Sequence, residues 1–281
     1  MLSAVAMAAQ SKPIEIFGLS NDGTSGKPAS PGDVGTAATP AWARSQFLGL
    51  LKTDSLRTEG FEAAAVGETY QANTRPPLVF EPVNGSGKAV NANLLPSKPL
   101  DPDLDPPLQN PGLVTATPAA GSYAGRFNTT GGYGSGGWSS GKWWEATGEF
   151  TISFESAISA FGFYLTDSND FGGLLALALT DESGAVTELT LPETGGSQGS
   201  SLLFFGFTDA TTAYKSITFS ITQDGDVPLN YDVFGLDDLL IGELMRGGGG
   251  NVPEPSSLAL AALSLGALAA SRRRKPAAAT A

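Results

Sequence analysis

Apolar residues alternate with small or polar residues along most of the second half of the chain. Phe150, Ile152 and Phe154, for example, are separated by Thr151 and Ser153. A period of two places alternate side chains on opposite faces of a β-strand. Strands are therefore expected at residues 150–154, 161–165, 175–179, 203–207, 217–221 and about 234–243. Turn sequences rich in Asp, Ser and Gly separate these strands and no strong helical segment intervenes, which predicts an all-β antiparallel sandwich.

The first half of the chain divides by composition. Residues 10–55 are rich in Gly, Pro, Ser and Thr and predict a flexible N-terminal arm. With a first strand expected at 60–65, the sandwich domain spans 56–244, which is long enough for one core between two sheets. Residues 76–118 hold ten of the 19 prolines and predict a long irregular insertion. A glycine-rich linker, 245–251, follows the domain.

The chain contains neither Cys nor His. It therefore has no disulfides and no thiol chemistry, and it lacks the commonest general base and transition-metal ligand. Ser-His-Asp hydrolysis and His-ligated zinc are excluded. Glycoside hydrolysis by two carboxylates is not excluded, but no convincing pair stands out and a non-enzymatic protein is expected.

Acidic residues outnumber basic ones. Without the tail after residue 250, 12 Lys and Arg face 27 Asp and Glu, a net charge of −15. Such a domain will not bind nucleic acid through its phosphates. It could bind divalent cations or neutral sugars, or its acidity could serve solubility alone.

The C-terminal tail, residues 252–275, has three parts in a fixed order. Val252, Pro253, Glu254 and Pro255 form an extended motif, because proline stops regular structure. The uncharged run 258–270 follows, about 20 Å long as a helix against a hydrocarbon core of about 30 Å. Its candidate membrane-anchoring residues are Leu258, Leu260, Leu263, Leu265 and Leu268. Arg272, Arg273 and Arg274 then resist translocation, so the body should face outward. The alternative is a buried core helix.

This tail resembles the PEP-CTERM sorting signal of exported bacterial proteins. The resemblance implies processing by an exosortase near Pro253–Pro255, with the chain held only transiently in the inner membrane. It also implies a Gram-negative-type host that makes exopolysaccharide or biofilm, and a final location in the cell envelope, on the cell surface or in the extracellular matrix. Residues 1–9 are apolar and end near Ala6-Met7-Ala8, which fits part of a signal peptide. An ordinary N-terminus is the alternative.

Segments of the body resemble those of PEP-CTERM proteins, namely Phe161–Tyr164, Leu203–Phe207 and Phe234–Leu239. The expected shape resembles jelly-roll lectin-like and carbohydrate-binding modules. In those modules a structural calcium often uses an acid on the first strand and an Asp on the last. The matching positions are Glu62, Asp237 and Asp238. An acid between Leu236 and Leu240 is costly to bury unpaired, and a cation would relieve that cost. The loop 167–170 is a rival site, and solvated aspartates are the simpler alternative.

An aromatic cluster is the second candidate site. Tyr133, Trp138 and Trp143 lie in or beside a glycine-rich stretch, and flat aromatic faces stack on sugar rings. The alternative is that Trp143 or Trp144 belongs to the core.

Three functions remain open. The first is a non-catalytic surface or matrix protein whose sandwich binds polysaccharide, and we expect this one. The others are a purely structural or adhesive surface protein, and a glycosidase that uses carboxylates only.

Overall fold

The computed structural model describes residues 12–20, 39–68, 77–98, 112–116, 126–130, 133–134, 137–138, 141–146, 149–168, 173–192, 201–223 and 234–245. One helix, α1 (Pro40–Gly49), and one 3-10 turn, η1 (Thr53–Ser55), accompany the strands. The strands are β1 (Ile14–Ser20), β2 (Arg57–Glu59), β3 (Leu78–Pro82), β4 (Val90–Lys98), β5 (Gly112–Ala116), β6 (Tyr133–Gly134), β7 (Gly137–Trp138), β8 (Lys142–Ala146), β9 (Glu149–Ile158), β10 (Ala160–Thr166), β11 (Gly173–Asp181), β12 (Val186–Thr190), β13 (Leu202–Thr208), β14 (Tyr214–Gln223) and β15 (Phe234–Ile241).

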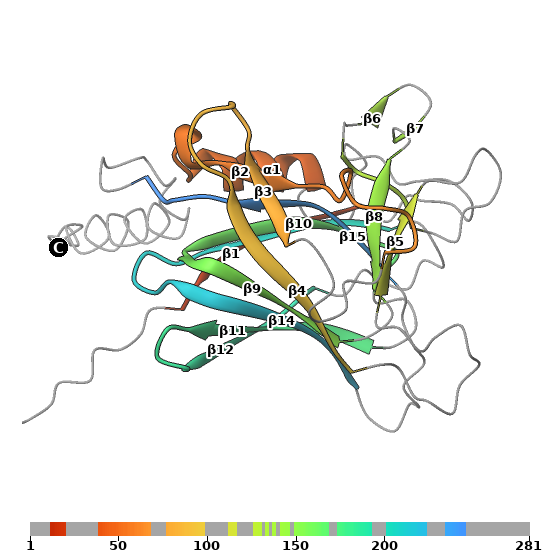
Figure 1. Ribbon diagram of the computed structural model, residues 1–281. Coiled ribbons are helices and arrows are strands. Elements are labelled where there is room, and N and C mark those ends of the chain that lie inside the picture. The colour runs from red at the N-terminus through yellow and green to blue at the C-terminus, as the bar shows by residue number, and fades with distance from the viewer. Residues whose placement is uncertain are drawn as a thin grey trace, which may run out of the picture. The chain divides into compact units, whose positions relative to one another are not determined.

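Thirteen strands form one antiparallel sheet, in the order β1-β13-β10-β15-β2-β3-β4-β9-β14-β11-β12, with β8 beside β15 and β5 beside β8. The sheet folds over between β2 and β4, so that β15 and β10 face β9 and β14 across the core (Figure 1). The all-β sandwich predicted from the sequence is confirmed. The six predicted strands correspond to β9, β10, β11, β13, β14 and β15.

The core lies between the two layers and is rich in phenylalanine. Phe150 stacks on Phe219 with ring centroids 4.6 Å apart, and Phe163 meets Phe219 edge-on at 5.3 Å. Leu177, Phe161 and their neighbours on alternate positions of each strand are fully buried. This is the packing that the period of two predicts, because alternate side chains of each strand enter one core.

Strands β10 and β13 are also covered on their outer side by α1, so every residue in both strands is buried. The helix inserts Phe47 over two glycines. A Cβ at Gly162 would lie 2.8 Å from the Phe47 ring, and one at Gly206 would lie 2.7 Å from it. Side chains at either position would therefore lift the helix. Phe47, Phe204, Tyr164 and Ala43 belong to this second, smaller core.

Two predictions for the first half need correction. The expected flexible arm, 10–55, contains β1, which pairs with β13, and α1, which packs on the sheet. The expected irregular insertion, 76–118, contains β3, β4 and β5. Its prolines were misleading because those in strands occupy tolerated places: Pro82 ends β3, and Pro96 lies at a register shift in β4.

The strand predicted at 60–65, the first of the expected sandwich domain, is also placed too late. β2 covers 57–59, and residues 60–65 form a turn in which Phe61 has a φ of +60°. Strand β12, which lies between two predicted strands, was not predicted.

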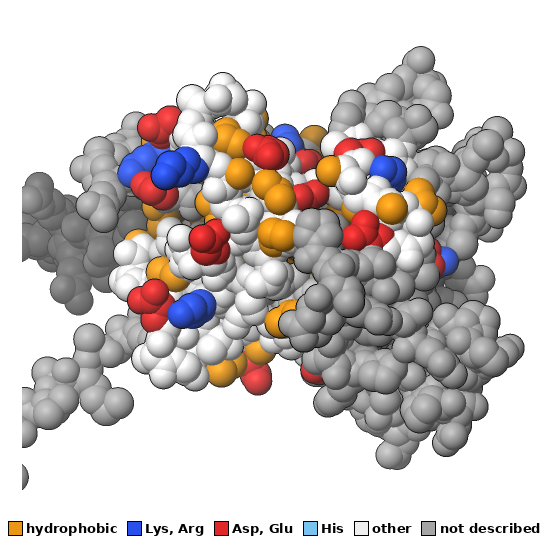
Figure 2. Space-filling model, in the orientation of Figure 1, with side chains coloured by type: hydrophobic (Ala, Val, Ile, Leu, Met, Phe, Trp, Pro, Cys, Tyr) orange, Lys and Arg blue, Asp and Glu red, His pale blue; other side chains and the backbone are white. Residues whose placement is uncertain are grey.

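The chain separates into two compact units, 1–244 and 245–281. Residues 246–281, with the sorting motif, the apolar run and the basic cluster, lie outside the described residues. Among the residues that are described, no helix has the length and hydrophobicity needed to cross a bilayer. On the face of the body shown in Figure 2, hydrophobic side chains lie in small groups among acidic and basic ones.

Candidate functional site

Strand β15 changes partner in its middle, at the two adjacent acids. Residues 234–236 pair with β8, and residues 239–241 pair with β2. On the other edge, the pairing with β10 shifts register between Asp237 and Leu240, which places an extra residue in β15. Asp238 has a φ of +49° at this bulge. A bulge re-aims the side chains of its strand, and here the two aspartates leave in different directions.

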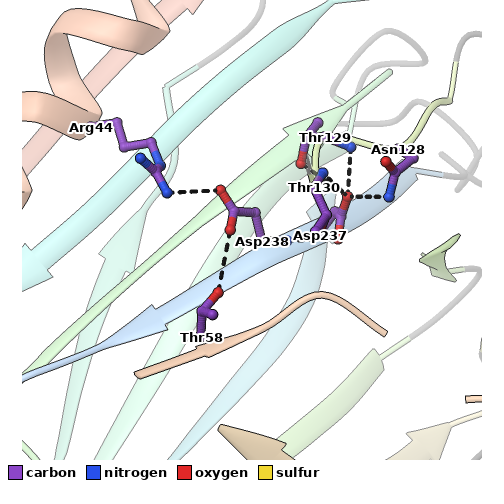
Figure 3. A network of polar contacts seen from close by, with 7 residues as sticks. All are labelled: Arg44, Thr58, Asn128, Thr129, Thr130, Asp237 and Asp238. Atoms are coloured by element: carbon purple, nitrogen blue, oxygen red, sulfur yellow. Dashed lines mark hydrogen bonds and ion pairs between the residues drawn. The ribbon is translucent and has the colours of Figure 1, made fainter. Parts of the chain in front are cut away.

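Asp237 is 1 % exposed and is enclosed by six hydrogen-bond donors (Figure 3). Its Oδ2 accepts from Asn128 Nδ2 at 3.1 Å, from the Thr129 amide at 2.6 Å and hydroxyl at 3.0 Å, and from the Thr130 amide at 3.0 Å. Its Oδ1 accepts from the Thr130 hydroxyl at 3.0 Å and the Asp238 amide at 2.7 Å. We call the groups of residues 128–130 and the Asp238 amide the donor cage.

Burial and the neighbouring Asp238 charge raise the pKa of Asp237 to about 8, although the donors of the cage pull it down. Desolvation therefore outweighs hydrogen bonding at this carboxyl.

Asp238 points to the opposite side, toward α1 and β2. Arg44 Nη2 lies 3.2 Å from its Oδ2, and the Thr58 hydroxyl donates to its Oδ1 at 3.3 Å. Burial raises the pKa of Asp238, while the Arg44 charge lowers it. Tyr164 lies in the same core under α1, and its burial raises the pKa of the phenol. The ion pair fastens the helix to the bulged strand.

The calcium hypothesis named Glu62, Asp237 and Asp238, and the structure brings two of them together. Asn128 Nδ2 donates to Glu62 Oε1 at 3.0 Å, to the Lys142 carbonyl at 2.7 Å and to Asp237 Oδ2 at 3.1 Å. Asp238 is held elsewhere by Arg44. The described residues contain no group of three acids placed to hold a metal ion. An amide nitrogen stands where these oxygens converge, so the present donor set does not fit calcium unless the Asn128 amide turns over and presents its oxygen.

All three described non-glycine residues with positive φ lie within this region. They are Phe61 beside Glu62, Asp167, and Asp238 beside Asp237. Asp167 is buried and lies 3.1 Å from Arg126, which also contacts Glu145 at 3.0 Å. Residues held in such conformations cost of order 1–3 kcal/mol each, so the surrounding contacts must over-determine them. These contacts come from several elements: Arg126 pairs with Asp167, Arg44 pairs with Asp238, and the Phe61 amide donates to Glu59. The rival calcium loop, 167–170, is described only at Asp167 and Ser168.

The predicted aromatic cluster does not form a sugar platform at Trp143. That residue is 2 % exposed and Trp144 is fully buried, because β8 is covered on both faces. The alternative reading, that these tryptophans belong to the core, is the one observed. Tyr133 and Trp138 pair through their backbones in β6 and β7, and their side chains lie outside the described part of the chain.

Sequence reasoning missed Trp42, which is 51 % exposed on α1. The helix begins after Thr39, whose hydroxyl accepts from the Trp42 amide at 3.2 Å, and Pro40 opens its first turn. A Thr-Pro start is a recognised N-terminal signal of a helix, so the helix was detectable. The glycine- and proline-rich stretch that precedes it obscured it.

A second missed feature is an open cavity of about 380 Å³ lined by residues of 52–57, 156–158 and 241–243 with Val90. None of these residues stands in a recognisable motif, and only the fold brings them together.

The tail matches the family described as the PEP-CTERM protein-sorting motif over residues 251–275. The chain therefore carries a PEP-CTERM sorting motif, which marks an exported protein that an exosortase sorts at the cell envelope. No curated protein matches the chain.

Two solved structures share weak similarity with the body. The K2 cleaved adhesin domain of Lys-gingipain is 14 % identical, with 67 % of this chain and 98 % of that chain covered, at a TM-score of 0.28. The enzymatically active domain of tailspike protein 4 of bacteriophage CBA120 is 13 % identical, with 56 % and 18 % covered, at a TM-score of 0.24. Scores this low carry no argument about function.

Proposed function

We propose that the body is a non-catalytic domain that binds polysaccharide at the cell surface or in the extracellular matrix. The observation that carries this proposal is the exposed ring of Trp42 on α1, at 51 % exposure. Ser45 and Gln46, one turn further along the helix, are also exposed. An indole face can stack on the C–H face of a sugar, while hydroxyl and amide groups bond its hydroxyls.

The helix holds Trp42 in a fixed position, which favours binding. Ala43 and Phe47 are fully buried on its inner side, and Arg44 pairs with Asp238 at 3.2 Å. Phe47 sits against Gly162 and Gly206 and packs on Phe204 with ring centroids 5.8 Å apart. The protein therefore loses little conformational entropy when a ligand binds, because the helix already holds Trp42 in place.

The experiment is titration of the full-length chain, in detergent micelles, with exopolysaccharide from a biofilm-forming bacterium. We expect Trp42→Ala to weaken binding about fivefold to tenfold, the value of one aromatic stacking contact. Val186→Ala is the matched control, because Val186 is an exposed apolar side chain (57 %) on β12. Equal binding by the wild type, Trp42→Ala and Val186→Ala would refute the platform.

The same titration separates the alternatives. A purely structural or adhesive protein would show no saturable binding to the polysaccharide. A carboxylate-only glycosidase would release reducing ends over time, whereas the proposed binding domain leaves the polysaccharide intact.

A further inference from the structure

The cavity of about 380 Å³ lies where β9 and β15 end, next to η1 and β2. Its floor is apolar. Ile158 and Ile241 belong to the main core and are 7 % and 3 % exposed, and Val90 packs partly buried against that core. Such a floor offers van der Waals contact to the C–H groups of a small ring.

Arg57 is a fixed cation in the lining of this cavity. Its Nε donates to the Lys88 carbonyl at 2.8 Å, and its Nη1 donates to the Asp54 and Leu56 carbonyls at 3.0 Å. Within the described residues, no carboxylate forms an ion pair with it. Carbonyl oxygens orient a guanidinium without neutralising it, so Arg57 is held in place with its charge retained.

Gly87 leaves the space that the Arg57 guanidinium occupies. A Cβ at Gly87 would come within 2.5 Å of Arg57 Nη2, and the residue has a φ of +96°. Gly85, in the same turn, has a φ of +66° but nothing within 4 Å of the corresponding Cβ. The turn therefore contains two glycines with a positive φ, and a side chain would collide with Arg57 at only one of them, Gly87.

Hydrogen-bond acceptors also line the cavity. Glu243 pairs with Lys52 at 2.6 Å, and Asp54 is exposed beside them. Two cations and two anions leave the lining without net charge, while the body around it carries −15 over residues 1–250. A polyanion would be repelled by that body. Sugar hydroxyls, which both donate and accept, match a lining that holds donors and acceptors together.

We propose that this cavity binds a sugar unit of a neutral glycan, with Arg57 donating to its hydroxyls and the ring resting on Ile158 and Ile241. This proposal rests on the proposed polysaccharide-binding function and adds a second contact point at a different place from Trp42.

The test uses the full-length chain in detergent micelles with four probes: hexasaccharides of glucose, mannose and N-acetylglucosamine, and hexagalacturonate as the acidic probe. Calorimetry gives the dissociation constant, and amide NMR signals of Ser55, Gly242 and Glu243 report on the cavity. We expect a neutral hexasaccharide to shift these signals. Gly87→Ala should weaken its binding about tenfold or more, as expected for loss of a hydrogen bond to a charged group.

Gly85→Ala is the matched control and should leave the affinity within twofold, because it also places an alanine at a positive φ but makes no contact with Arg57. Ser156→Tyr is a second variant, which fills the cavity from β9 and leaves the three carbonyl contacts of Arg57 intact. It should also reduce binding at least about tenfold.

The proposal is overturned if only hexagalacturonate binds, or if Gly87→Ala and Gly85→Ala weaken binding equally. It is also overturned if Trp42→Ala weakens binding while Gly87→Ala and Ser156→Tyr do not, although the polysaccharide-binding function would then stand. Absence of binding by the wild type to every probe and to whole exopolysaccharide would remove both proposals together.

Discussion

Asp237 and Asp238 are neighbours on one strand, both are largely buried, and the fold stabilises them by different means. Asp237 is surrounded by backbone amides, threonine hydroxyls and one side-chain amide, with no cation in the donor cage. Asp238 has an arginine at 3.2 Å and one threonine hydroxyl. The contacts of Asp237 hold the segment 128–130 against β15, whereas those of Asp238 hold α1 and β2 against the same strand.

The difference shows how a bulge can organise two regions at once. In a regular strand two successive side chains would also face opposite sides, but β15 would keep a single partner along this edge. At the bulge it leaves β8 and joins β2, and the two aspartate side chains accept hydrogen bonds from residues 128–130 on one side and from Thr58 on the other. A buried polar group is tolerated only where partners replace water, and each aspartate meets that demand separately.

Removal of the Asp237 carboxylate should have the largest effect on stability. Asp237→Ala leaves the amide and the hydroxyl of the buried Thr129 without their acceptor, so we expect a loss of about 4 kcal/mol in the free energy of unfolding. Denaturant unfolding of the full-length chain measures it. Asp237→Asn keeps one acceptor oxygen and should cost less than half as much. Equal losses in the two variants would show that the donor cage does not stabilise Asp237.

The pH dependence of stability should come mainly from the Asp237 carboxyl group. Its pKa rises from an ordinary value near 4 to about 8 on folding, so the folded state binds the proton more tightly than the unfolded state. This contribution is fully present below about pH 4 and is lost as the pH rises to about 8. We expect a fall of a few kcal/mol across that window, measured by denaturant unfolding at a series of pH values.

The matched variant for this measurement is Asp237→Asn, which cannot titrate. Its curve should be flatter between pH 4 and 8. A curve as steep as that of the wild type would place the titrating group elsewhere.

Calcium binding stays a prediction, and Asn128 offers a way to test it. Asn128→Asp places a third carboxylate beside Glu62 and Asp237, whose oxygens lie 3.0 and 3.1 Å from the present amide nitrogen. In chelator we expect a loss of about 3 kcal/mol through like-charge repulsion and lost hydrogen bonds, and calcium should restore most of it. Thermal unfolding of wild type and variant, each with calcium and with chelator, gives the comparison. If calcium stabilises neither the wild type nor the variant, a calcium site at residue 128 is excluded.

The second half of the fold could be predicted because its signal is local. The alternation of Phe150, Ile152 and Phe154 with polar residues directly predicts that one face of the strand is buried. All three side chains are in the core. The first half could not be predicted in this way. β1 is a strand because it pairs with β13, a contact distant in sequence, and β3 is a strand because it lies between β2 and β4 in the sheet.

The candidate sites divide in the same way into parts that the sequence could predict and parts that depend on distant contacts. The approach of Glu62 to Asp237 was anticipated from a resemblance, but the donor cage depends on Asn128 and two threonines that form no motif. Arg44 could not be assigned to Asp238, because the helix that carries it lay in a stretch whose composition indicated a flexible arm. A partly exposed ion pair between residues 194 positions apart follows only from the fold.

Substitutions of Asp238 should lower the free energy of unfolding less than those of Asp237. Two such substitutions should separate the contribution of the ion pair from that of backbone strain. Arg44 is 34 % exposed, so water can solvate it when its partner is removed, and Asp238→Ala should cost only about 2 kcal/mol. Asp238→Gly removes the same carboxylate but relieves the φ of +49°, so it should be about 1 kcal/mol more stable than the alanine variant. Denaturant unfolding of the two variants measures the difference. If glycine is no better than alanine, the bulge stores no strain at Asp238, and the ion pair with Arg44 alone accounts for the contribution of this side.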